Sequence, residues 1–171
     1  MGDETIRILL IEDNPGDARL IQELLKDVNG FPFQFTFADR LSDGLAKLSE
    51  GGFSIVVLDL SLPDSTGYET FSQVSSRFPG LPIVLLTGLD DEQLGERAVR
   101  EGAQDYLLKG ELDGNLLSRA IRYAIERKRS EEALRESQER YMLATQGAND
   151  GLWDWDLRKD TVHYSPRWKA M

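Results

Sequence analysis

Five short apolar runs occur in the first two thirds of the chain, and each is about the length of a β-strand. Most of them are rich in Ile, Val, Leu or Phe. In chain order they cover residues 6–11, 33–37, 54–58, 82–86 and 104–108. The first, third and fourth have nearly continuous apolar cores, which is typical of strands buried on both faces of a sheet. The pattern therefore predicts five strands, three of them fully buried.

Segments with apolar residues at helical spacing lie between these runs and after the last one. They cover residues 18–28, 41–48, 68–78, 94–99 and 116–125. Strand and helix thus alternate five times over about 125 residues, and this rhythm favours parallel strands joined by right-handed helical crossovers. We predict an α/β fold: a doubly wound five-stranded parallel sheet with helices on both faces.

The last of these helices is predicted to continue as an extended C-terminal helix. Almost no helix breaker occurs between Gly114 and Leu143, so one helix of about 30 residues would span about 45 Å. Its second half, residues 127–140, is dense in Arg and Glu. This half is either a solvated helix or a helical linker that dimerises along a thin apolar seam, which includes Leu134 and Tyr141.

The composition narrows the chemistry that this chain can perform. Its 171 residues include no Cys and one His, which excludes disulfides, thiolate zinc sites, Cys nucleophiles and sites with several His ligands. Acidic residues number 30 and basic residues 20, and the first 114 residues hold 21 of the acids and 9 of the bases. Carboxylate chemistry remains, and carboxylates favour hard cations such as Mg²⁺.

The excess of acidic residues and the short apolar runs also limit the partners and the cellular location that we expect. A formal charge of −10 and a pI of about 4.6 argue against a nucleic-acid binder. The apolar runs are far too short to span a bilayer, and Asp3 and Glu4 stand where a secretory signal would carry Lys or Arg. We expect a cytoplasmic protein, or a cytoplasmic part of a larger one, with no membrane segment and no nucleic-acid partner.

Polar residues gather at the carboxyl ends of the predicted strands, where ligands bind in open parallel sheets. The first strand ends in Glu12 and Asp13, the third in Asp59, the fourth in Thr87 and the fifth in Lys109. Each residue taken singly has a structural interpretation, such as a helix cap, a loop cap or a solvated strand end. Taken together, the three acids would repel one another without a cation, and Mg²⁺ relieves that repulsion.

This arrangement suits phosphoryl transfer. A carboxylate beside Mg²⁺ and a lysine can act as a nucleophile toward a phosphoryl group, and aspartyl phosphates are a known product of such attack. The metal and Lys109 would offset the charge on the transferring phosphoryl oxygens. Thr87 could then donate a hydrogen bond to the acquired group.

Four sequence motifs, in this order and spacing, resemble those of the receiver domain of two-component response regulators (CheY-like). They lie at residues 8–14 (ILLIEDN), 56–64 (VVLDLSLPD) with Gly67, 83–88 (IVLLTG) and 102–110 (GAQDYLLKG). The resemblance covers residues 5–128. It implies a flavodoxin-like fold with strand order 2-1-3-4-5.

The resemblance also implies a role for each acid of the cluster. Asp59 would be the phosphoacceptor and a ligand of Mg²⁺. Asp13 would bind the metal directly, and Glu12 would bind it through water. The backbone carbonyl of Ser61 would be a further ligand.

The remaining site residues take their expected roles from the same resemblance. Thr87 and Lys109 would hold the phosphoryl group, and Tyr106 matches the aromatic switch that turns inward with Thr87 on activation. One position departs from the family pattern. In the family a proline usually follows the lysine, and the peptide bond between them is commonly cis, but here Gly110 follows Lys109. A trans bond at Lys109–Gly110, or a looser loop there, is therefore to be considered.

Beyond the receiver, the chain changes character. We expect a receiver domain over residues 1–128 and a helical linker over 129–143 that continues the last receiver helix. Residues 144–171 would be the truncated N-terminal piece of a PAS domain, because stretches 140–144, 148–157 and 164–169 resemble the opening of that sensory fold. At about 27 residues this piece is too short to fold alone.

The expected function is that of a phosphoacceptor in two-component signal transduction. A histidine kinase or phosphotransfer protein would phosphorylate Asp59, and the change would pass to a C-terminal PAS-containing output. The chain would be regulatory rather than an enzyme, with slow self-catalysed phosphotransfer and dephosphorylation. Dimerisation through the fourth and fifth helices and the linker is a further expectation. A small Mg²⁺-dependent phosphohydrolase and a phosphorylation-independent scaffold are the alternatives.

Overall fold

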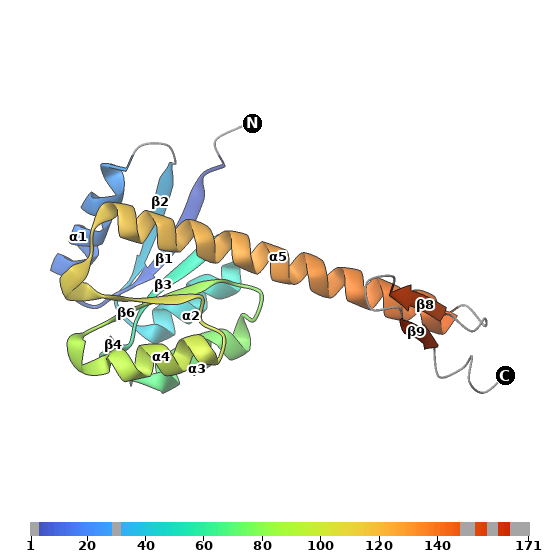
Figure 1. The fold of residues 1–171 in the computed structure, drawn as a ribbon. Helices are drawn as coiled ribbons and strands as arrows, with labels where there is room; N and C mark the ends of the chain where they lie inside the picture. Colours follow the sequence, from blue (N-terminus) through green and yellow to red (C-terminus); the bar gives the residue numbers. More distant parts are fainter. Residues whose placement is uncertain (1–3, 29–31, 148–152, 157–160, 165–171) are drawn as a thin grey trace. The chain divides into compact units, whose positions relative to one another are not determined.

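The computed structural model describes residues 4–28, 32–147, 153–156 and 161–164 (Figure 1). Strands and helices alternate along the first part of the chain, with two short 3₁₀ turns at Leu89–Asp91 and Lys109–Glu111. The elements are β1 (Ile6–Ile11), α1 (Pro15–Lys26), β2 (Phe33–Ala38), α2 (Leu41–Glu50), β3 (Ile55–Asp59), β4 (Ser61–Leu62), β5 (Ser65–Thr66), α3 (Tyr68–Arg77), β6 (Ile83–Thr87), α4 (Glu92–Arg100), β7 (Asp105–Leu108), α5 (Gly114–Gly147), β8 (Trp153–Asp156) and β9 (Thr161–Tyr164).

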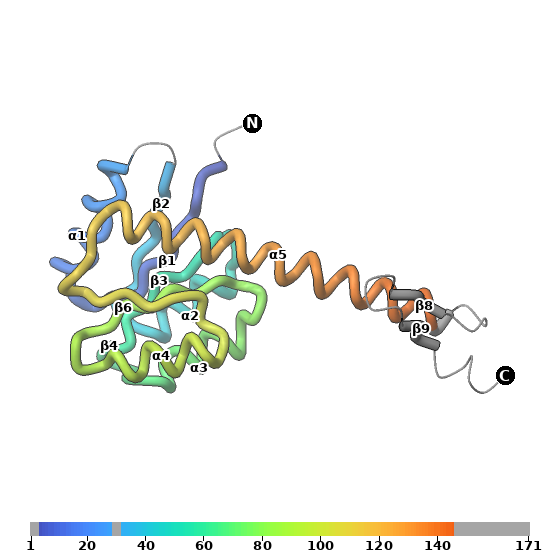
Figure 2. The backbone as a smooth tube through the Cα atoms, in the orientation of Figure 1, coloured from blue at the N-terminus to red at the C-terminus, as the bar shows by residue number. Residues whose placement is uncertain are grey.

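The five predicted strands form one parallel sheet in the order β2-β1-β3-β6-β7. This confirms the predicted fold class and the strand order 2-1-3-4-5, counted over the five main strands. Figure 2 traces the backbone through these strands and helices as a tube. A small antiparallel hairpin, β4–β5, interrupts the chain after β3 and was not predicted, because two-residue strands carry no periodic signal.

Two hydrophobic clusters cover the two faces of the sheet. Alternate residues of β1 enter different clusters, since successive side chains of a strand point to opposite faces. Leu9 and Ile11 join the cluster formed with α2, α3 and α4, whereas Ile8 and Leu10 join the one formed with α1 and α5. Helices on both faces explain why β1, β3 and β6 have nearly continuous apolar cores, as the sequence indicated.

The helix α5 runs from Gly114 to Gly147 without interruption, which confirms the extended C-terminal helix. The chain divides into two compact units, Met1–Arg129 and Ser130–Met171. In the second unit β8 and β9 pair as an antiparallel hairpin. The rest of the predicted PAS piece, residues 148–152, 157–160 and 165–171, lies outside the described residues.

Within the part of the chain that the structure describes, no helix combines the length and the apolar character needed to cross a membrane.

Candidate functional site

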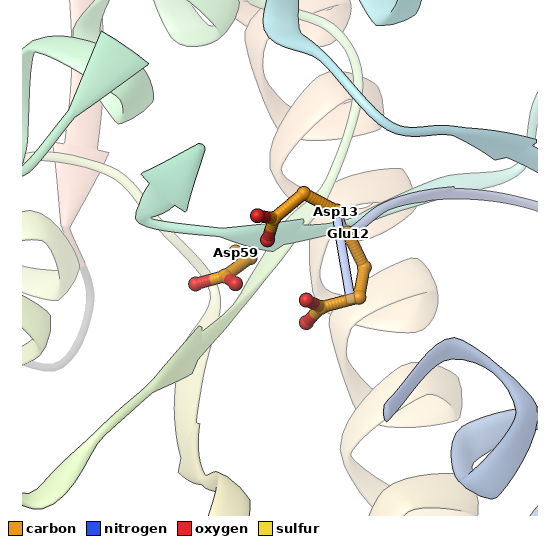
Figure 3. A group of neighbouring side chains, drawn as sticks. All are labelled: Glu12, Asp13 and Asp59. Atoms are coloured by element: carbon orange, nitrogen blue, oxygen red, sulfur yellow. The ribbon is translucent and has the colours of Figure 1, made fainter. Parts of the chain in front are cut away.

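Three carboxylates converge at the carboxyl ends of two neighbouring strands. Glu12 and Asp13 directly follow β1, and Asp59 is the last residue of β3, which pairs with β1. One oxygen from each lies within 4.8 Å of the others. Figure 3 shows the side chains of Glu12, Asp13 and Asp59 beside one another. The sheet topology therefore brings together acids that are 46 residues apart in the chain, as the strand-end argument predicted.

The junction between β1 and α1 holds the first of these acids in place. Asn14 caps α1: its Oδ1 accepts hydrogen bonds from the backbone N–H of Gly16 at 2.8 Å and of Asp17 at 3.3 Å. Pro15 begins the helix, a position where its missing N–H and restricted φ do no harm. The Asn14 N–H in turn donates to Glu12 Oε1 at 3.0 Å. The sharp turn from strand to helix thus orients the Glu12 carboxylate.

Lys109 supplies positive charge to the acids from the end of β7. Its Nζ lies 2.7 Å from Asp59 Oδ2, 2.7 Å from Glu12 Oε2 and 3.1 Å from Asp17 Oδ2. Burial lowers the pKa of Lys109, but the carboxylates of Asp59 and Glu12 outweigh that effect and hold the pKa above its ordinary value of 10.5. The lysine is therefore charged at neutral pH. The peptide bonds that the structure describes are all trans, and these include Lys109–Gly110.

Glu12 and Asp59 are buried, and Asp13 is exposed. Burial raises the pKa of Glu12, and Lys109 and the Asn14 N–H only partly oppose that rise. Glu12 Oε2 lies close to Lys109 Nζ, but the two atoms are not aligned as a hydrogen bond, and this oxygen has no other partner among the described residues. A buried carboxylate oxygen with unused acceptor capacity beside two further carboxylates is a donor set that suits a hard divalent cation.

Ser61 lies next to the acids, in the hairpin that follows β3. Its backbone N–H donates to Asp59 Oδ1 at 3.0 Å, while Lys109 occupies the other oxygen, Oδ2. The hairpin closes through the pair Ser61–Thr66, and Gly67 N–H donates to the Leu60 carbonyl at 2.7 Å. Both oxygens of Asp59 are thus oriented, one by the hairpin and one by the lysine.

Thr87 and Tyr106 lie on neighbouring strands and on one face of the sheet. Tyr106 is in register with Leu85, and Thr87 follows Leu85 by two residues, so both side chains project on the same side. Thr87 is only 1% exposed, and its hydroxyl has no hydrogen-bond partner among the described residues. The half-buried Tyr106 ring packs against α4, and burial, together with the charges of Glu92 and Glu96, raises the pKa of its hydroxyl.

The structure also reveals two acids that the sequence interpretation missed. Asp17, in the first turn of α1, contacts Lys109, and its place near the start of the predicted helix was the only local signal. Asp64 caps α2 across the fold: its Oδ1 accepts from the Leu41 N–H at 2.8 Å and its Oδ2 from the Ser42 N–H at 2.9 Å. No local pattern marks this cap, because 23 residues separate Asp64 from Leu41.

A parallel five-stranded sheet with acids and a lysine at its carboxyl edge defines the chain as an α/β receiver-type domain. The comparison with known families agrees, since residues 8–122 match the family of response regulator receiver domains. The chain therefore belongs to the response regulator receiver domain family.

Curated relatives of the chain include proteins named as regulators. It is 32% identical over 114 residues to the swarming motility regulation protein RssB of Serratia marcescens, which matches 67% of this chain and 51% of that protein. It is 30% identical over 122 residues to the response regulator protein FleR of Pseudomonas aeruginosa, across 70% of this chain and 24% of that protein. The chain thus spans about a quarter to a half of the length of these relatives.

Solved structures show the same fold. A response regulator receiver domain protein from Clostridium thermocellum aligns with a TM-score of 0.64 at 28% identity, covering 72% of this chain and 97% of that one. The signal receiver domain of an HD domain-containing protein from Pseudomonas fluorescens Pf-5 aligns with a TM-score of 0.67 at 27% identity, covering 78% and 96%.

Proposed function

We propose that this chain is a phosphoacceptor receiver in two-component signal transduction, phosphorylated on Asp59 with the help of Mg²⁺. One observation carries the proposal: Asp59 is buried, shares a cluster with Glu12 and Asp13, and has Lys109 Nζ 2.7 Å from its Oδ2. A carboxylate so placed can act as a nucleophile, and the neighbouring charges can balance the incoming phosphoryl group.

In the proposed reaction, an oxygen of Asp59 forms a bond to phosphorus as the bond from phosphorus to the donor's histidine nitrogen breaks. Glu12, Asp13, Asp59 and the carbonyl of Ser61 would hold Mg²⁺, which neutralises charge on the transferring oxygens. Lys109 would add a second positive charge beside the phosphoryl oxygens.

Two residues would respond to the new phosphoryl group. The Thr87 hydroxyl is buried and lacks a partner among the described residues, so it is free to donate to a phosphoryl oxygen. Tyr106, on the same face of the sheet, would then change position as the switch residue. The phosphodonor histidine would belong to a histidine kinase or phosphotransfer protein.

We further propose that the chain is organised as a receiver over residues 1–128, a helical linker over 129–143 and the start of a PAS domain over 144–171. The uninterrupted α5 supports a route by which the receiver could influence a C-terminal output. Homodimerisation through α4, α5 and the linker belongs to the same proposal. It is supported by the exposed side chains of Leu134 and Tyr141, which are 60% and 59% exposed and seven residues apart.

Phosphorylation with a small phosphodonor tests the central proposal. We expect acetyl phosphate and Mg²⁺ to add one phosphoryl group to the wild type, measured by intact-mass spectrometry, and none to Asp59→Asn. Asp90→Asn, which changes an exposed acid before α4, should be labelled like the wild type.

Chelation of Mg²⁺ should abolish labelling. Equal labelling of wild type and Asp59→Asn would refute the assignment, and continuous turnover of phosphate esters would favour a phosphohydrolase.

A further inference from the structure

Lys109 contacts a third carboxylate that belongs to neither β1 nor β3. Asp17 Oδ2 lies 3.1 Å from Lys109 Nζ and reaches it from α1, across 92 residues of chain. The same nitrogen contacts Glu12 and Asp59 at 2.7 Å. Asp17 and the proposed phosphoacceptor thus share one ammonium group.

The placement of Asp17 differs from that of an ordinary helix-start acid. Its N–H donates to the capping Asn14 at 3.3 Å, which holds the residue at the strand-to-helix turn. Asp43 occupies the equivalent first turn of α2, but it pairs with Lys47 one turn along its own helix at 2.7 Å. One turn after Asp17 the chain offers Leu20 and Ile21 instead of a cation. Its cationic partner therefore comes from the site.

Asp17 is also the most exposed of the three partners of Lys109. Its side chain is 38% exposed, against 5% for Asp59 and none for Glu12. An exposed ion pair contributes little free energy, so this is the contact that Lys109 can most easily give up. The two buried contacts cannot be broken without leaving a buried charge uncompensated.

We propose that Asp17 is a positioning residue that holds Lys109 in the unphosphorylated site and opposes the phosphoryl group. The inference rests on the proposed function of Asp59. When phosphoryl oxygens arrive, Lys109 turns from Asp17 to those oxygens, and the remaining negative charge of Asp17 repels them. The same charge attracts a cation. Asp17 therefore raises the affinity of the site for Mg²⁺ and lowers its affinity for the phosphoryl group.

The neutral, nearly isosteric variant Asp17→Asn separates these effects. With the full chain, we expect the Kd for Mg²⁺ alone, measured by calorimetry, to rise about threefold, as expected for one charge at several ångströms in water. At saturating Mg²⁺, we expect beryllofluoride, used as the probe for the phosphoryl group, to bind about threefold more tightly. Both differences should shrink at about 0.5 M salt, because Asp17 is partly exposed.

Matched controls define the outcome. Asp43→Asn removes an equivalent first-turn acid away from the site and should leave both affinities unchanged, and Asp17→Glu should behave like the wild type. If both affinities of Asp17→Asn match the wild type, or both weaken together as they would if the variant only loosened the fold, the inference is wrong. If the wild type binds beryllofluoride no better than Asp59→Asn, the proposed function itself fails.

Discussion

The position of the Tyr106 ring depends on the absence of a side chain at Gly95. A Cβ at this position would lie 2.8 Å from both Cγ and Cδ2 of Tyr106, closer than such atoms approach in proteins. These atoms belong to the rigid ring, so a small side-chain adjustment cannot relieve the overlap. Gly95 also lies inside α4, where glycine is less favourable than alanine by about 1 kcal/mol. The glycine thus gives up helix stability and leaves room for the ring.

Gly95→Ala should therefore displace the Tyr106 ring in the unphosphorylated protein. We expect the aromatic resonances of Tyr106, followed by NMR, to move toward those of the wild type with beryllofluoride, because a methyl group excludes the resting position. Gly80→Ala, at a position where a Cβ would meet no atom within 4 Å, should leave these resonances unchanged. Unaltered Tyr106 resonances in Gly95→Ala would show that the ring position does not depend on this glycine.

At the scale of elements, Asp64 joins the loop after β3 to the start of α2. The residue at the N-cap of α2, Arg40, makes no capping hydrogen bond with its side chain. The side chain of Asp64 caps the helix instead, because it accepts hydrogen bonds from the N–H groups of Leu41 and Ser42. The hydrogen bond from the Ser42 N–H holds the pKa of Asp64 below its ordinary value of 3.8. The β4–β5 hairpin beside Asp59 is therefore attached to a helix on one face of the sheet.

Asp64→Ala should lower the free energy of unfolding by about 1 kcal/mol at neutral pH, as expected for loss of a helix cap. Because the pKa is lowered in the folded state, the stabilisation is present above pH 3.8 and is lost as the pH falls through the folded-state value. Urea denaturation at a series of pH values should show the difference from wild type narrowing below pH 3.8. A difference that stays constant with pH would contradict the role of the carboxylate, and Asp90→Ala serves as the control.

For the whole molecule, the first compact unit holds the complete candidate site. The unit Met1–Arg129 includes the sheet, the acids and Lys109, whereas the exposed Leu134 and Tyr141 follow it on α5. Its core is formed by the two clusters on the faces of the sheet. The candidate site and the proposed seam for dimerisation are thus separable along the chain.

A fragment of residues 1–129 should therefore fold and bind Mg²⁺ and beryllofluoride like the full chain. With beryllofluoride, we expect the full chain to self-associate more strongly than the fragment, because only the full chain carries the linker. Multi-angle light scattering gives the masses, and calorimetry gives the affinities. A fragment that fails to fold, or a full chain that stays monomeric at high concentration with beryllofluoride, would contradict this organisation.

The sequence carried much of this organisation in its local patterns. Continuous apolar runs predicted the buried strands, because a strand covered on both faces has no polar side, and the strand ends then predicted where Glu12, Asp13 and Asp59 meet. The motif resemblance supplied the strand order, and the lack of breakers predicted the length of α5.

Only the tertiary structure decided which distant groups touch. Asp17 contacts Lys109 across 92 residues, and Asp64 caps α2 from 23 residues away. Gly95 in α4 leaves space for the ring of Tyr106 in β7. Periodicity reports the side on which a residue is buried, but a contact between side chains depends on how whole elements pack. The sequence alone therefore determined the fold and the acidic edge of the sheet, and packing decided how the lysine, the loop and the aromatic ring are held there.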